Sequence, residues 1–79
     1  MNIIMMKSMS EQKFEQQIIE EAHEFAKLHR EKILGLSEDE LIRYFNSQLD
    51  YESWKIFNVY SPKLLRLFIK TVKEDLSKS

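Results

Sequence analysis

The sequence contains no cysteine, one glycine and one proline among its 79 residues. Without cysteine the chain has no disulfide framework, no thiolate metal ligands and no cysteine nucleophile. So little glycine and proline excludes collagen-like, linker-like and turn-rich all-β chains. No apolar run approaches the roughly 18 residues of a membrane span. We therefore expect a helical domain without a membrane segment, and a cytoplasmic one because no secretion signal is recognisable.

The chain is small enough to need help in folding. Hydrophobic residues make up 43% of it and charged residues 32%, which is too apolar for a disordered tail. A domain of this size buries only roughly 60% of its unfolded surface and is marginal alone. Small domains are usually stabilised by disulfides, a metal, oligomerisation or a partner. Disulfides are excluded here and no set of metal ligands is recognisable, so oligomerisation or a partner is left as the source of stability. The size therefore favours a homo-oligomer or a complex with another protein.

The first helix is predicted to begin at Ser8 or Ser10, both of which are suitable N-caps, and to end near Leu34. Gly35 would then terminate it in the left-handed conformation. Residues 1–9 would form a flexible or docking N-terminal arm, and residues 10–79 a single helical domain. At about 100° per residue, one face of this helix is apolar. Its members are Phe14, Ile18, Ile19, Ala22, Phe25, Ala26, Leu28 and Ile33.

The next helix has the clearest start in the sequence. Ser37 and Glu40 have the spacing of a capping box, in which each side chain accepts a hydrogen bond from the other residue's backbone N–H. A tight turn over residues 34–37 would make the first two helices an antiparallel hairpin. The second helix is predicted to bury Leu41, Ile42, Phe45 and Leu49.

The helical phase breaks near Asp50, because a continued helix would turn Glu52 inward and Trp54 outward. Two interpretations follow: a short helix over 51–58, or a strand over 55–60, whose residues favour β-structure. The strand could pair only with residues 3–6, and a two-stranded sheet is marginal at best. We therefore favour the short helix.

The last helix is predicted to begin at Ser61-Pro62, with Ser61 as the cap and Pro62 in the first turn. Its apolar residues span about 200° of the helical wheel, about twice the stripe of a surface helix. Such a helix is either central in a bundle or has surplus surface for another chain. The predicted fold is all-α, a small bundle of three to four helices. It comprises an N-terminal αα-hairpin, a short third helix and a C-terminal helix packed across them.

The function predicted is that of a small protein-binding regulator, inhibitor or accessory subunit, which acts by steric contact and self-associates. Leu64, Leu67 and Phe68 would supply the apolar contact, with exposed rims of Trp54 and Tyr60. Tyrosine and tryptophan are favoured at protein interfaces because one end of each ring tolerates water.

A basic stripe on the last helix would steer the partner. Its members are spaced by three, four and three residues and so share one face: they are Lys63, Arg66, Lys70 and Lys73. Residues 61–79 carry 5 basic and 2 acidic groups, whereas residues 1–60 carry 7 and 11. The stripe would meet an acidic protein surface or, in the alternative function, nucleic-acid phosphates. The overall pI near 6.1 argues against a dedicated nucleic-acid binder.

Neither an enzyme nor a cofactor site is expected. No glycine-rich phosphate loop or catalytic constellation of serine, histidine and acid is recognisable. Glu20 and His23 have the Glu-x-x-His spacing found on a helix of a di-iron site. A di-iron site needs a second such motif, which the sequence lacks, and Glu20 and His23 are predicted to point outward. His29 lies across the apolar face of the first helix, where we expect a hydrogen-bonded, neutral, half-buried side chain.

Overall fold

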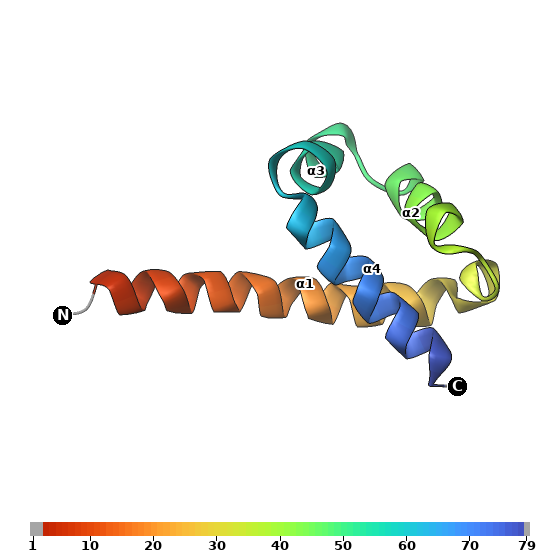
Figure 1. Cartoon of the computed structure of the whole chain (residues 1–79), viewed down its shortest axis with the longest axis horizontal. Helices are drawn as coiled ribbons and strands as arrows, with labels where there is room; N and C mark the ends of the chain where they lie inside the picture. Colours follow the sequence, from red (N-terminus) through yellow and green to blue (C-terminus); the bar gives the residue numbers. More distant parts are fainter. Residues whose placement is uncertain (1–2, 79) are drawn as a thin grey trace.

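The computed structural model describes the backbone of residues 3–78 and the side chains of residues 13–78. Within that range the chain is all-α, as predicted, with the helices α1 (Ile3–Ile33), α2 (Glu38–Ser47), α3 (Tyr51–Lys55) and α4 (Pro62–Ser77). A π-helical turn, η1 (Ile56–Tyr60), joins α3 to α4. Figure 1 shows α4 crossing the second half of α1, with α2 and α3 on the same side of α1. None of the helices in the described range is long and apolar enough to cross a bilayer.

The first helix begins earlier than predicted. It starts at Ile3, so the start at Ser8 or Ser10 is wrong. No glycine or proline interrupts residues 3–33, and each residue added to an existing helix gains a hydrogen bond at low cost. The segment from 3 to 9 is therefore the beginning of α1, and it projects away from the other helices (Figure 1). The first two residues of the predicted arm lie outside the described range.

The turn between α1 and α2 is formed by the predicted residues. Gly35 has a φ of 93°, the left-handed conformation in which a side chain would be strained. The Ser37 N–H donates to Glu40 Oε1 at 2.9 Å, and the Glu40 N–H donates to Ser37 Oγ at 3.2 Å. This reciprocal pair is the predicted capping box, and with Gly35 it turns the chain from α1 into α2.

The break near Asp50 is confirmed, and the strand interpretation of residues 55–60 is wrong. Asp50 caps α3 by accepting a hydrogen bond from the Ser53 N–H at 2.8 Å. The helix then continues past Asn58 to Tyr60, with its last five residues in π-helical form. Pro62 opens α4 as predicted, but the Ser61 side chain makes no capping hydrogen bond. Its backbone is otherwise engaged, since the Ser61 N–H closes the π-turn on the Ile56 carbonyl at 2.8 Å.

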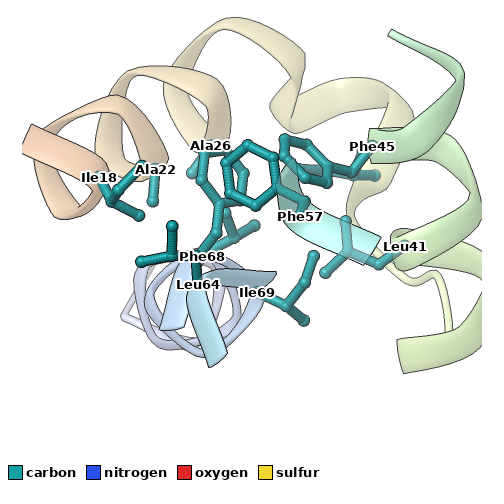
Figure 2. Close-up of a cluster of buried hydrophobic side chains, with 11 residues drawn as sticks. Ile18, Ala22, Ala26, Leu41, Phe45, Phe57, Leu64, Phe68 and Ile69 are labelled. Atoms are coloured by element: carbon teal, nitrogen blue, oxygen red, sulfur yellow. The ribbon is translucent and has the colours of Figure 1, made fainter. Parts of the chain in front are cut away.

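Four phenylalanines, one each from α1, α2, η1 and α4, meet at the centre of the bundle. Phe45 stacks on Phe68 with ring centroids 4.1 Å apart. Phe57 and Phe25 each present an edge to Phe45, at 5.1 and 5.5 Å. Such edge-to-face and offset-stacked pairs stabilise a core beyond the area they bury. Because α1, α2, η1 and α4 each contribute one ring, this cluster holds these four elements together. Figure 2 shows three of the rings, Phe45, Phe57 and Phe68, among the buried side chains of the core.

The last helix is the central one, which decides between the two interpretations of its wide apolar surface. It packs along α1 on one side and against η1 and α2 on others. Its buried residues are Leu64, Phe68, Ile69, Thr71 and Val72. On α1, Ile18, Ala22, Ala26 and Ile33 are buried as predicted. Two other members of the predicted apolar face are exposed, Leu28 at 75% and Phe14 at 48%. Leu28 lies beyond the edge of the face that α4 covers.

Candidate protein-binding surface

Three aromatic side chains of the α3–η1 segment are exposed instead of entering the core. Tyr51 is 68% exposed, Tyr60 65% and Trp54 38%. The rings of Tyr51 and Trp54 are nearly parallel, at an interplanar angle of 9° and a centroid distance of 6.4 Å. We call Tyr51, Trp54, Lys55 and Tyr60 the aromatic patch.

Lys55 connects the rings of the aromatic patch. Its Nζ lies 5.3 Å from the centroid of the Tyr51 ring and 5.5 Å from that of Tyr60. Both distances are within the range of a cation–π interaction, which is worth roughly 0.5–1 kcal/mol at an exposed site. Lys55 therefore restrains two tyrosines that are nine residues apart, so the patch is partly ordered before any partner binds.

The π-helical turn explains why Tyr60 is on the outside. A hydrogen bond from residue i+5 puts one more residue into the turn than an α-helix has. Phe57 keeps its place in the core, while Tyr60 is rotated off the face that Phe57 buries. Single π-helical turns occur frequently at functional sites.

A pair of asparagines ties this segment to α2. Asn46 Nδ2 donates to Asn58 Oδ1 at 3.2 Å, and Asn58 Nδ2 donates to Asn46 Oδ1 at 2.9 Å. Asn58 Nδ2 also lies 2.9 Å from the Trp54 carbonyl oxygen. With Phe57 in the core, this pair fixes the orientation of the aromatic patch on the bundle.

The structure divides the apolar residues that the sequence predicted for partner binding. Trp54 and Tyr60 are exposed and share the aromatic patch. Leu64 and Phe68 are core residues, 7% and 3% exposed, so their assignment to a free surface is wrong. Leu67 is half-buried against the same core. The reason is that α1, η1 and α2 already cover the wide apolar face of α4.

The basic stripe is exposed, but its ends are engaged within the chain. Lys73 Nζ pairs with Glu38 Oε1 of α2 at 3.0 Å, and Lys63 Nζ lies 3.7 Å from Glu15 Oε2 of α1. Arg66 and Lys70, in the middle, form no ion pair with another described side chain. Exposed ion pairs of this kind contribute little to stability, so their main effect is to reduce the positive charge that the stripe presents.

The two histidines both have hydrogen-bond partners. His29 is half-buried, with Nδ1 2.9 Å from the Tyr44 hydroxyl and its ring 4.6 Å from that of Phe25. This confirms the expected hydrogen-bonded histidine. His23 Nδ1 contacts Asp75 Oδ2 of α4. No group of three potential metal-ligating side chains occurs among the residues that the structure describes.

Two carboxyl groups have shifted pKa values, and both are helix caps. The backbone N–H of Ser37, and after it the serine side chain, lower the pKa of Glu40. The backbone N–H of Ser53, and after it the serine side chain, lower the pKa of Asp50. A carboxylate that accepts hydrogen bonds is favoured in its charged form. The hydrogen bonds that cause these shifts stabilise the starts of α2 and α3, the helices that carry or support the aromatic patch.

Sequence reasoning missed two features of this surface, the bridging role of Lys55 and the asparagine pair. The spacing of Tyr51 and Lys55 at i and i+4 was a signal for the first contact. The contact between Asn46 and Asn58 joins two helices and has no local signal. No family model, curated protein or solved structure matches the chain.

Proposed function

We propose that this chain is a small protein-binding regulator, inhibitor or accessory subunit that docks on another protein through its aromatic patch. One observation carries the proposal: Tyr51, Trp54 and Tyr60 are exposed together in a chain that packs four of its phenylalanines into one core. Tyrosine and tryptophan dominate the residues that contribute most to binding at protein interfaces.

The mechanism that fits this surface is steric. Tyrosine and tryptophan offer large contact areas at low cost in side-chain entropy. The contacts of Lys55 with two tyrosine rings lower that cost further, since the rings are restrained before binding. A partner bound to the aromatic patch would have its own contact surface blocked by the helical bundle, or would be held in a fixed position by it.

The experiment is affinity capture from a nuclease-treated lysate of the source cells with the full chain as bait. A Tyr51→Ser/Trp54→Ser/Tyr60→Ser variant should lose the stoichiometric partner that the wild type retains. A Phe14→Ser/Leu34→Ser variant is the matched control, because both residues are exposed apolar side chains outside the aromatic patch. If the triple variant keeps the partner, the patch is not the docking surface.

The second candidate function is nucleic-acid binding by the basic stripe. The observation that favours it is the pair Arg66 and Lys70, which are exposed on one face of α4. They line a shallow depression with Lys73, and Glu38 and Glu74 line it as well. Binding of this kind falls steeply with salt because counterions are released from the phosphates. An Arg66→Glu/Lys70→Glu variant would then lose nucleic acid, whereas a protein partner of the aromatic patch would survive high salt.

Self-association also stays a proposal for this chain. Its support is the size of the domain, which leaves little core to stabilise a monomer. Light scattering across a concentration series measures the oligomeric state directly. If the mass stays that of a monomer at every concentration, the chain does not self-associate, and the aromatic patch would bind a different protein.

A further inference from the structure

An open apolar groove runs between α1 and the segment from the end of α2 to η1. Phe25 and Leu28 line its α1 side, and Leu49, Ser53 and Phe57 line the opposite side. The core rings of Phe45 and Phe68 form its floor. The three rings of the aromatic patch do not line this groove, so it is a separate surface of the α3–η1 segment.

The carboxylates along the groove are not balanced by lysine or arginine, and His29, hydrogen-bonded to Tyr44, is the one basic side chain among the described residues that line it. Glu21 and Glu24, one helical turn apart on α1, are exposed along its edge, and neither pairs with another described side chain. No lysine or arginine of the described chain lines the groove. Leu28, a further turn along α1, adds a large exposed apolar side chain. The groove thus combines an aromatic interior with an acidic edge.

We propose that this groove binds a basic amphipathic helix of a partner protein. An apolar side chain of that helix would insert between Phe25, Leu28 and Phe57, and its lysines or arginines would pair with Glu21 and Glu24. Helices bind grooves in this way through apolar anchors on one face. Complementary charge at the rim sets the orientation and accelerates the encounter. The proposal is independent of the aromatic patch, because the two surfaces share no residue.

The test uses the full chain and two synthetic peptides. One is an amphipathic helix of leucine and lysine, and the other has glutamate in place of each lysine. The leucine–lysine peptide should bind at one site and shift the backbone amide NMR signals of Leu28, Leu49 and Ser53. The leucine–glutamate peptide should bind at least about tenfold more weakly, because it places like charges beside Glu21 and Glu24.

Matched variants distinguish binding in the groove from general attraction of the basic peptide to the acidic surface of α1. Glu21→Lys/Glu24→Lys should weaken the leucine–lysine peptide about tenfold. Glu20→Lys/Glu31→Lys changes the net charge equally on exposed residues of α1 outside the groove, and should weaken it much less. Leu28→Ser should weaken binding, whereas Leu34→Ser, exposed elsewhere, should not.

Three results would overturn the proposal. Equal loss with both charge-reversal pairs would show attraction to the whole acidic surface. Signal shifts at Tyr51 and Tyr60, with none at Leu49 and Ser53, would place the peptide on the aromatic patch instead. A stable dimer of the free chain that buries Leu28 and is broken by Leu28→Ser would make a second copy the occupant.

Discussion

The α3–η1 segment and α4 adjoin each other and are both rich in large apolar residues, yet they place them differently. Each has aromatic or aliphatic side chains on several sides of the helix. In α4 the wide apolar surface is covered by α1, η1 and α2, and Leu64, Phe68, Ile69 and Val72 are buried. In α3 and η1 only Phe57 is buried among the described residues.

The difference shows that neighbouring elements, more than residue type, determine what a helix exposes. The α3–η1 segment lies at the outer edge of the bundle (Figure 1) and has one face to pack. It is held by a cap, the asparagine pair and a single phenylalanine. The described chain leaves Tyr51 and Tyr60 mostly uncovered and Trp54 partly so, and these rings are therefore available to a partner.

The largest effect is expected in the packed region. Phe68→Ala should destabilise the chain by about 3–5 kcal/mol, because it removes a ring that three other phenylalanines contact and leaves a cavity. Chemical denaturation followed by circular dichroism measures the change. Phe14→Ala, which removes a ring that is half exposed, is the control and should cost far less. Similar losses in the two variants would contradict the packed core described above.

The asparagine pair should have the next largest effect. Asn58→Ala leaves the half-buried Asn46 amide without its partner and should cost about 1–3 kcal/mol. Asn46→Ala/Asn58→Ala should cost less than the two single changes added together, because the residues are directly coupled. Gln48→Ala is the control, since among the described residues its exposed amide donates only to the neighbouring Ser47 hydroxyl. Additive losses would mean that the pair does not fix the segment.

Low pH should weaken the starts of α2 and α3. The pKa values of Glu40 and Asp50 are lowered in the folded chain. Their contribution is therefore present above their unfolded pKa values, near pH 4, and is lost as pH falls through the lower folded values. Glu40→Gln/Asp50→Asn keeps a hydrogen-bond acceptor at each site but should flatten the acid limb of thermal stability. Glu31→Gln, which removes one exposed charge without removing a cap, is the comparison.

The smallest effect on stability is expected in the aromatic patch. Tyr60→Ser removes an exposed ring and one cation–π contact, so it should cost only about 0.5 kcal/mol. The same denaturation measurement applies. A loss of several kcal/mol would show that Tyr60 is structural, and would remove the reason for assigning it to a partner.

Local chemistry explains which features were predictable from the sequence. The capping box of Ser37 and Glu40, the left-handed Gly35, the break before Tyr51 and the position of Pro62 each depend on residues close together in the chain. The all-α fold follows from the same signals and from the helical periodicity of the apolar residues. The start of α1 was misplaced because a serine that suits a cap is also tolerated inside a helix.

Exposure was decided by packing between distant segments. Helical periodicity placed Leu28, Leu64 and Phe68 alike on the apolar faces of their helices. Leu64 and Phe68 are buried because α1, α2 and η1 pack around α4, whereas Leu28 is exposed because it lies beyond the edge of α4. The outward rotation of Tyr60 depends on a π-turn that has no local sequence signature. The acidic-edged groove likewise exists because four elements meet around the phenylalanines. Caps and periodicity are properties of a segment, whereas burial is a property of the surfaces that surround it.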